Sequence, residues 1–236
     1  MRFQWKYLLF FCIFCSSLFG RSHFLLIGSP GSGKGTFTQY LMKHGEYEHL
    51  CVGDILREEI KKETEIGQKI RDCVASGLLV PDEITFQLFR KRFVDVLSSQ
   101  SSIIVDGMVQ SPANVQFFDH LLEEFNLEDE FNYVYFSISR SLARERILSR
   151  MICEKCGAIS NRELQLRRNC LCGGMFQSRL DDCQESVDRR IGRFFERVLP
   201  LVDCYRNREG FYRFDSRKEL DEKIADYKSV FTGLRN

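Results

Sequence analysis

The segment that most constrains this chain is Gly28-Ser-Pro-Gly-Ser-Gly-Lys-Gly-Thr36, which directly follows the short apolar run Phe24–Ile27. An apolar run of this length before a glycine-rich stretch predicts a buried strand that turns into a helix near Lys34. Small residues let backbone N–H groups wrap around a polyphosphate, and the N-terminus of the following helix attracts the anion. The segment therefore predicts a phosphate-binding loop. The residues expected to hold the phosphates are Gly31, Ser32, Gly33, Lys34, Gly35 and Thr36.

Further apolar patterns predict how the rest of the chain is organised. Runs rich in β-branched and aromatic residues predict strands at Ile103–Val105, Tyr133–Ile138 and Phe211–Phe214. Apolar residues at helical spacing occur at Ile55–Ile60, Ile84–Val96, Val115–Phe125 and Val187–Tyr205. Strands that alternate with helices predict an α/β fold with a doubly wound parallel sheet.

Charge and cysteine content narrow the class of partner. The chain has 236 residues, with 34 Lys plus Arg against 33 Asp plus Glu. A net charge near zero without long like-charge runs argues against a general nucleic-acid or membrane-surface binder and favours small-molecule partners. The length fits a monomer, and one core carrying mobile sub-domains fits it as well as two domains. A chain of this size does not need its ten cysteines as disulfides, so metal ligation or simple burial explains them better.

The first twenty residues predict an extension outside the fold. Arg2 and Lys6 precede an apolar run of 13 residues, Tyr7–Phe19, which has the outline of a signal peptide. The run is shorter than the roughly 18 residues that cross a membrane, and it lacks an A-x-A cleavage site. A signal, an anchor and a misassigned translation start remain open for Met1–Gly20. A cytoplasmic location is the expectation.

The form of the phosphate loop resembles that of a known family. Gly35 stands between Lys34 and Thr36, whereas the strict Walker pattern puts Ser or Thr directly after the lysine. The form G-x-P-G-x-G-K-G-T resembles the phosphate loop of adenylate kinases, and the resemblance extends from Ser22 to about Phe231. It implies reversible transfer of the terminal phosphoryl group of Mg-ATP to AMP, giving two ADP, with Lys34 bridging the β- and γ-phosphates.

The resemblance also implies a P-loop core with a helical lobe for the nucleoside monophosphate (NMP) and an inserted small lid lobe. Between Cys153 and Cys172, polar residues, glycines and four cysteines replace the apolar pattern, which marks that insertion. Closure of both lobes over the substrates would exclude water. The implied division is 1–20 extension, 21–50 core with P-loop, 51–80 NMP-binding lobe, 81–149 core, 150–186 lid and 187–236 core.

Two segments resemble the acceptor side of the family. His49-Leu-Cys-Val-Gly-Asp-Ile-Leu-Arg57 resembles H-I-S-T-G-D-M-L-R, in which Arg57 would meet the monophosphate, and Ser76–Glu83 resembles G-x-x-V-P-D-E around the acceptor base. Asp106 ends an apolar strand, where P-loop enzymes place the carboxylate that holds Mg²⁺ through its water shell. The residues implied to contact AMP are Val52, Arg57, Val80, Gly107, Gln110, Asn114, Arg179 and Arg190.

The acceptor motifs also depart from the family. The family reads D-G-F-P-R where this chain reads Asp106-Gly-Met-Val-Gln110, so an arginine on the acceptor phosphate is absent. Loss of such a charge-assisted contact costs about 1.5 to 3 kcal/mol, roughly 10- to 100-fold. Asn114 replaces a longer glutamine amide and Val52 replaces threonine. Two alternatives therefore stay open: a kinase for another nucleoside monophosphate, and a weakly active nucleotide-binding regulatory protein.

Arginines are expected to carry the chemistry. Transfer to a phosphate oxygen that is already ionised needs cations around the transferred group and no general base. Glu145–Arg150 resembles the family's E-R-x-x-G-R, and Arg179-Leu-Asp-Asp182 followed by Arg190 resembles R-x-D-D and its later arginine. Taken singly, each arginine is equally explained by a surface ion pair. The resemblance implies that Arg146 binds ATP, while Lys34, Arg150, Arg179 and Arg190 are catalytic.

Four cysteines in the insertion predict a structural zinc site. Cys153-x-x-Cys156 and Cys170-x-Cys172 supply enough thiolates for one tetrahedral Zn²⁺. The second pair is off the family spacing, which would put a ligand at Asn169. A metal-free lid or redox-active thiols are the alternatives. Buried or incidental thiols are expected at Cys51, Cys73, Cys183 and Cys204.

Overall fold

A five-stranded parallel sheet forms the centre of the molecule. The computed structural model describes residues 22–160, 169–179, 181–218 and 220–233, so the extension expected at Met1–Gly20 lies outside them. The strand order is β2-β3-β1-β4-β8, and every neighbouring pair is parallel. The strands are β1 (His23–Gly28), β2 (Tyr47–Cys51), β3 (Ser102–Asp106), β4 (Phe131–Ser137) and β8 (Phe211–Asp215). All four predicted strands are present, and β2 is an additional one.

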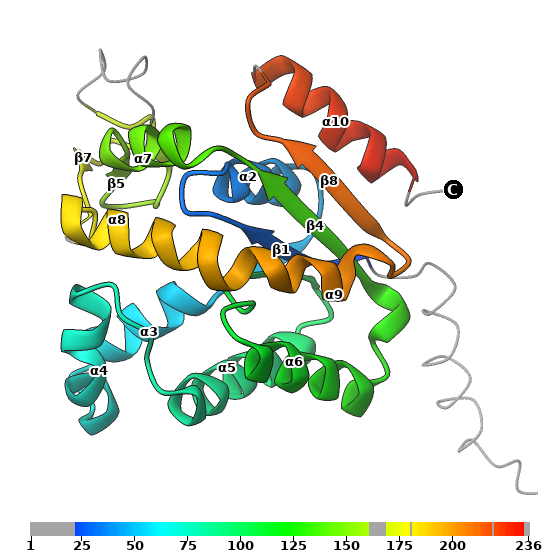
Figure 1. Cartoon of the computed structure of the whole chain (residues 1–236), viewed down its shortest axis with the longest axis horizontal. Helices are drawn as coiled ribbons and strands as arrows, with labels where there is room; N and C mark the ends of the chain where they lie inside the picture. The colour runs from blue at the N-terminus through cyan, green and yellow to red at the C-terminus, as the bar shows by residue number, and fades with distance from the viewer. Residues whose placement is uncertain (1–21, 161–168, 180, 219, 234–236) are drawn as a thin grey trace, which may run out of the picture.

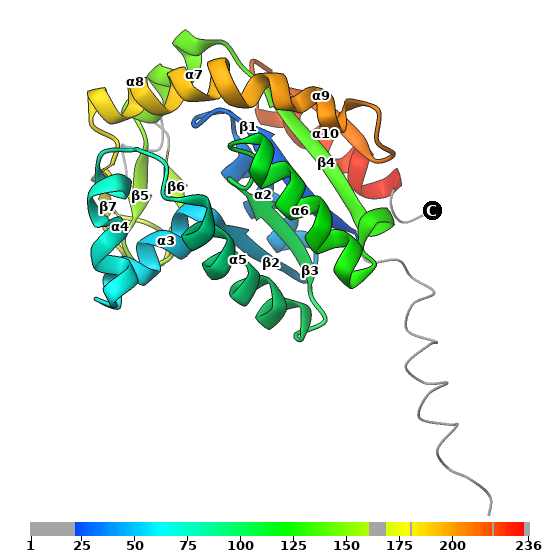
Figure 2. The ribbon, with the colours of Figure 1, turned by 60° about the horizontal axis from the view of Figure 1, so that its bottom comes forward.

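Helices cover both faces of the sheet, as Figures 1 and 2 show. One face packs Phe24 and Leu26 of β1 against α2 (Lys34–His44) and α10 (Leu220–Gly233). The other face packs Leu25 and Ile27 against α5 (Asp82–Leu97), α6 (Pro112–Phe125) and the segment after α8 (Gln184–Arg193). Alternate residues of a strand point to opposite faces, and in β1 both sets are apolar because both faces are buried. The doubly wound α/β prediction is confirmed.

The predicted helix Val187–Tyr205 is interrupted, which corrects the prediction. After α8, a π-helical turn (Phe194–Val198) and a 3-10 turn (Leu199–Val202) lead into the short α9 (Asp203–Arg206). Pro200 lacks a backbone N–H, and its ring clashes with the carbonyl four residues earlier in an α-helix. The chain therefore changes its hydrogen-bond pattern around this proline and still buries Val198, Val202 and Tyr205.

Two smaller parts lie at the carboxyl edge of the sheet. Helices α3 (Val52–Lys61) and α4 (Glu65–Ala75) follow β2 and pack against each other. Helix α7 (Arg140–Leu148) leads into a small antiparallel sheet of order β6-β5-β7, made of β5 (Met151–Cys153), β6 (Ile159–Ser160) and β7 (Phe176–Gln177). A 3-10 turn (Glu128–Glu130) precedes β4. In Figure 1, α8 passes between α7 and the α3–α4 pair, so both smaller parts lie beside the same helix.

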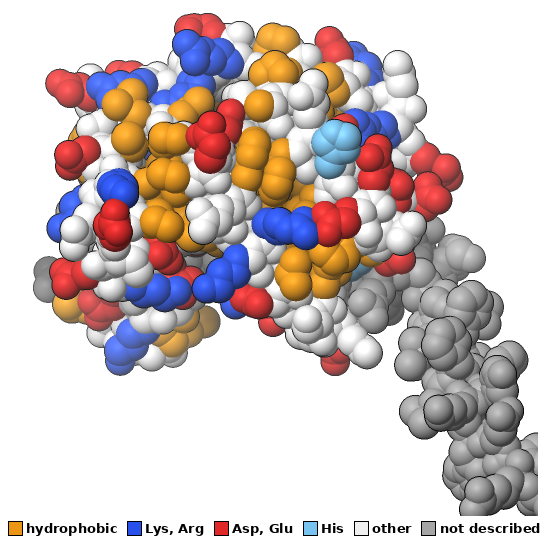
Figure 3. Space-filling model, turned by 90° about the horizontal axis from the view of Figure 1, so that it is seen from below, with side chains coloured by type: hydrophobic (Ala, Val, Ile, Leu, Met, Phe, Trp, Pro, Cys, Tyr) orange, Lys and Arg blue, Asp and Glu red, His pale blue; other side chains and the backbone are white. Residues whose placement is uncertain are grey.

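The surface carries mixed charge. On the face in Figure 3, acidic and basic side chains alternate with hydrophobic ones, and neither sign covers the face. This pattern accords with the formal net charge of +1. Among the helices that the structure describes, none is both long enough and apolar enough to cross a membrane.

Candidate active site

The phosphate loop is the turn from β1 into α2, at the carboxyl end of the central strand. Gly31 and Gly33 have positive φ angles of 79° and 98°, which glycine adopts without steric cost. A Cβ at Gly31 would also lie 2.6 Å from the carbonyl oxygen of Ala143 in α7. The hydroxyls of Ser29 and Ser32 are buried and find no hydrogen-bond partner in the described parts of the chain. The loop therefore holds polar groups whose hydrogen bonds are still to be made, as a phosphate-binding loop requires.

Lys34 folds back over this loop. Its Nζ donates to the carbonyl oxygens of Gly28 and Ser29 at 2.7 and 3.1 Å. The same Nζ lies 3.8 Å from the carboxylate of Asp106, which ends the neighbouring strand β3. After β1 the chain crosses to β2 on one side, and after β3 it crosses back to β4 on the other side, so β1 and β3 form a switch point of the kind where open α/β sheets bind ligands. The structure thus brings the predicted lysine and the predicted magnesium carboxylate to one spot.

Two of the predicted catalytic arginines share one buried aspartate. The Nε and Nη2 of Arg150 donate to Asp182 at 2.9 and 2.7 Å, and Nη1 of Arg190 donates to the same carboxylate at 3.0 Å. The Asp182 side chain is 3% exposed. Burial, together with the cations of Arg179 and Arg190, lowers the pKa of Arg150, although Asp182 acts in the opposite direction. Asp182 therefore holds together cations that repel one another.

Arg57 and Arg179 connect α3 to the segment before α8. Arg57 in α3 pairs with Asp54 at 2.6 Å and with Asp181 at 3.5 Å, and Arg179 lies 3.9 Å from Asp54. Burial alone would lower the pKa of Arg57, but Asp54, Cys51 and Asp181 together outweigh it and raise that pKa. Across the whole cluster four arginines face three aspartates. The arginines are Arg57, Arg150, Arg179 and Arg190, and the aspartates are Asp54, Asp181 and Asp182. The excess of positive charge suits a polyanionic ligand.

The remaining acceptor residues surround the turn after β3. Gly107 has a φ of 79°, and a Cβ there would lie 3.8 Å from Cβ of Val52. The Gln110 amide donates to the carbonyl oxygen of Gly107 at 3.3 Å. Asn114 is buried, and its amide donates to Asp82 at the start of α5, at 2.9 Å. The Asn114 amide nitrogen is thereby engaged within the protein, and its partner Asp82 follows the buried Val80 by two residues. Val52, Gly107 and Gln110 thus lie together, while Asn114 faces α5.

Arg146 and Thr36 lie on the two helices that flank the phosphate loop. Arg146 is in the last turn of α7, one turn after Ala143, whose carbonyl lies against Gly31. Thr36 is in the first turn of α2. Gly35, next to it, approaches the lid, because a Cβ there would lie 2.7 Å from Ile159 of β6. The nucleotide-binding residues expected from the sequence therefore occupy neighbouring elements.

Two further arginines were not singled out by the sequence. Arg189 and Arg193 on α8 donate to the carbonyl oxygens of Ser76 and Gly77, which directly follow α4. Gly77 needs to be glycine here, since its φ is 65° and a Cβ would lie 2.5 Å from the Ser186 hydroxyl. Burial and the cations of Arg190, Arg197 and Arg189 lower the pKa of Arg193. The repeated arginines of α8 were the available sequence signal for this docking contact.

The four lid cysteines meet, as the sequence predicts. The Sγ atoms of Cys153 and Cys172 are 3.4 Å apart, and those of Cys156 and Cys170 are 3.6 Å apart. All four lie within 4.8 Å of one another. Cys170 is the fourth member of the cluster, where family spacing would give Asn169, and it starts a turn in which the Gly173 N–H donates to the Cys170 carbonyl. The cluster forms a possible metal site.

The pKa values of the thiols in this cluster favour a bound cation. The backbone N–H of Cys156 lowers the pKa of Cys153 to about 6. The Ala158 N–H lowers the pKa of Cys156, but the other three thiols outweigh it and raise that pKa to about 12. Four adjacent thiols cannot all ionise unless a cation neutralises them. The donor set and spacing therefore fit a tetrahedral ion with sulfur ligands.

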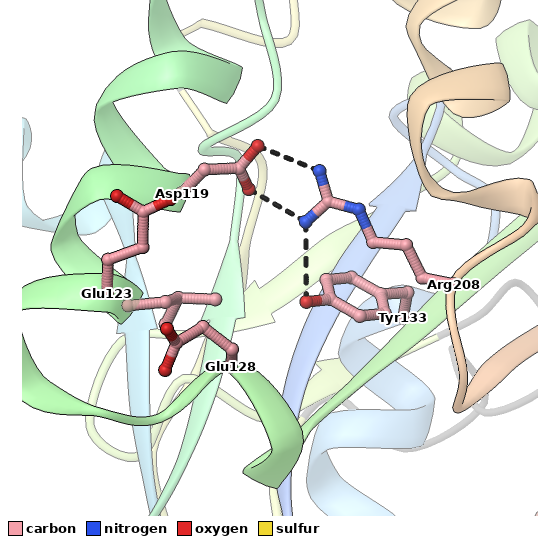
Figure 4. A pocket seen from close by; sticks show the side chains of 6 residues that line it. Asp119, Glu123, Glu128, Tyr133 and Arg208 are labelled. Carbon is pink, nitrogen blue, oxygen red and sulfur yellow. Dashed lines mark hydrogen bonds and ion pairs between the residues drawn. The ribbon is translucent and has the colours of Figure 1, made fainter.

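A cavity outside the phosphate site is shown in Figure 4. It has a volume of about 250 Å³ and lies beside α6 and the start of β4, where Arg208 makes two 2.8 Å hydrogen bonds to Asp119. The Arg208 guanidinium also lies over the rings of Tyr133 and Tyr205, at 5.2 and 4.5 Å from their centroids. These contacts fasten the turn after α9 to α6, and they have no part in the phosphate site.

Comparison with known proteins agrees with this geometry. The family model described as adenylate kinase matches residues 26–210. An adenylate kinase of Fervidobacterium nodosum is 32% identical over 214 residues, covering 89% of this chain and 97% of that protein. An adenylate kinase of Rickettsia rickettsii is 32% identical over 87% of this chain and 97% of its own length. One of Caldicellulosiruptor bescii is 34% identical over 77% and 86%. With the phosphate loop, the arginine cluster and these matches together, the chain belongs to the adenylate kinase family.

Proposed function

We propose that this protein is an adenylate kinase that transfers the terminal phosphoryl group of Mg-ATP to AMP, giving two ADP. The observation that carries the proposal is the convergence of Lys34 and the four-arginine cluster on the carboxyl edge of the sheet. Phosphoryl transfer is catalysed by positioning and by charge stabilisation. A site of fixed cations suits that reaction.

The proposed roles follow from position. Lys34 and the loop N–H groups hold the β- and γ-phosphates, while Arg57 holds the acceptor phosphate. Arg150, Arg179 and Arg190 neutralise the migrating group, since they already share carboxylates that the substrates' phosphates can replace as partners. Mg²⁺ enters with ATP, and Asp106 is the residue that would hold it through water.

The test is the rate of ADP formation from Mg-ATP with AMP, CMP, UMP and GMP as acceptors. A preference for AMP is expected. A preference for another acceptor would favour a different nucleoside monophosphate kinase, the candidate that Val52, Gln110 and the engaged amide of Asn114 suggest. Nucleotide binding without turnover with any acceptor would contradict both and leave a regulatory role.

Gln110→Arg is expected to raise kcat/KM for AMP by roughly 10- to 100-fold, because it restores a charge-assisted contact worth about 1.5 to 3 kcal/mol. The change should appear mainly in KM for AMP and little in KM for ATP. Gln116→Arg adds the same charge at an exposed position of α6 and serves as the control. An unchanged or lower kcat/KM in Gln110→Arg would show that the existing arginines already saturate the acceptor phosphate.

We also propose that the lid cysteine cluster holds a structural Zn²⁺. One zinc per chain is expected to survive gel filtration, and Cys156→Ser is expected to lose it and to lower the melting temperature, because binding free energy of a structural ion contributes to folding. Metal analysis and thermal unfolding measure both. Cys183→Ser, an exposed cysteine outside the cluster, should change neither. A metal-free wild type with an unchanged melting temperature in Cys156→Ser would refute the proposal.

A further inference from the structure

Cys51 is a thiol that the proposed reaction does not use. It stands where the family motif has serine, and it is the last residue of β2. In the parallel pairing of β2 with β3, Cys51 lies opposite Asp106. His49 is two residues earlier in β2, so it points to the same face of the sheet as Cys51. The carboxyl ends of two adjacent strands therefore place an imidazole, a thiol and a carboxylate side by side.

The three side chains are close enough to share one ion. One ligand atom from each of His49, Cys51 and Asp106 lies within 4.8 Å of the other two. Zn–N and Zn–S bonds of about 2.0 to 2.3 Å put tetrahedral ligand atoms about 3.5 Å apart. A small inward movement of these partly buried side chains would bring the ligand atoms from within 4.8 Å to the separation of about 3.5 Å that a tetrahedral ion requires. Nitrogen, sulfur and carboxylate oxygen are also the three atoms that zinc accepts in proteins.

The His49 imidazole has an unused hydrogen-bonding group at this site. The Nε2 atom of His49 is buried, and no hydrogen-bond partner for it exists among the residues that the structure describes. A buried imidazole nitrogen without a partner carries an unmet desolvation cost, which a metal ion removes. The neighbouring cations are Lys34, whose Nζ lies 3.8 Å from the Asp106 carboxylate, and Arg57, which acts on Cys51.

We propose that His49, Cys51 and Asp106 form a second transition-metal site, separate from the lid cysteine cluster, which takes Zn²⁺ and thereby inhibits the enzyme. Zinc displaces the thiol proton to solvent and occupies Asp106. Asp106 is the carboxylate assigned to Mg²⁺ above, so the inhibition rests on the proposed function, whereas the binding does not. Soft thiolate and imidazole ligands favour zinc over magnesium, so the two ions are discriminated by chemistry.

Metal binding is tested on the full chain after the lid cluster has been loaded with one equivalent of Zn²⁺. A titration with Co²⁺ then reports thiolate ligation through its charge-transfer absorption. The wild type and Cys204→Ser, which removes an exposed cysteine of α9, are expected to bind a second ion with this absorption. Cys51→Ser restores the family residue and is expected to lose the absorption and to bind the second ion at least 10-fold more weakly. His49→Gln provides a second variant in case Cys51→Ser does not fold.

Inhibition is tested by measuring ADP formation against Zn²⁺ concentration. Half-inhibition of Cys51→Ser is expected to need at least 10-fold more Zn²⁺ than that of the wild type, and higher Mg-ATP should relieve inhibition of the wild type. Equal second-ion binding in wild type and Cys51→Ser would overturn the site. Different binding with equal inhibition would overturn the regulatory role. Absence of turnover in every variant, with cobalt binding as expected, would overturn the proposed function and leave the site standing.

Discussion

Lys34→Met is expected to lower kcat/KM for Mg-ATP by about 10³-fold while the fold is preserved. Removing one preorganised donor to a developing charge costs roughly 10² to 10³ in rate, and Lys34 is proposed to contribute at two phosphates. The side chain is 13% exposed and already lies at the carbonyls of Gly28 and Ser29, so its ammonium needs little reorganisation to reach the anion. Methionine keeps the length and the apolar stem but removes the charge and the donors.

Lys43→Met is the matched control, since Lys43 lies in the last turn of the same helix and is exposed. It should retain the rate of the wild type. Thermal unfolding of both variants separates catalysis from folding, because Lys34 also donates two hydrogen bonds within the loop. If Lys34→Met kept more than about a tenth of the wild-type kcat/KM, a loss of about 1.4 kcal/mol or less, the phosphate role would be wrong.

The sequence predicted the buried parts of the fold because their patterns are simple. Strand β1 is apolar at every central position, and both of its faces are covered by helices. Strand β2 was not predicted as a strand, since Tyr47-Glu-His-Leu-Cys51 is largely polar. The structure explains this composition: β2 is one of the two edge strands of the sheet, and Leu50 is its single buried residue. An edge strand with one exposed side does not need the apolar run that marks a central strand.

The sequence predicted those parts of the candidate site that short motifs encode. The phosphate loop and the four lid cysteines are local patterns, and the structure brings their members together. What the sequence did not predict are contacts between separate elements, such as Arg193 with Gly77 and Asp54 with Arg179. These depend on how the acceptor helices dock on α8, a tertiary arrangement that no short motif encodes. The same holds for the meeting of His49, Cys51 and Asp106 across two strands.

Asp182→Asn is expected to reduce both activity and stability, although Asp182 is proposed to touch no substrate. Its buried carboxylate holds Arg150 and Arg190, whose side chains are only 14% and 18% exposed. Removing one partner of a buried ion pair leaves uncompensated charge and costs about 3 kcal/mol or more, which in a domain of this size lowers the melting temperature by about 6 to 12 °C. Misplaced arginines should also lower kcat/KM by about 10²-fold.

Asp188→Asn is the matched control, since Asp188 pairs with Arg144 on the exposed side of α8, with side chains 47% and 39% exposed. A surface pair of this kind contributes about 1 kcal/mol at most. A two-substrate analogue distinguishes a positioning role from simple destabilisation. Its phosphates would pair with the arginines, so the deficit in melting temperature of Asp182→Asn should be smaller with the analogue bound. A deficit that stays the same with the analogue bound would mean that phosphates do not reach Arg150 and Arg190, and it would remove both from the proposed transfer site.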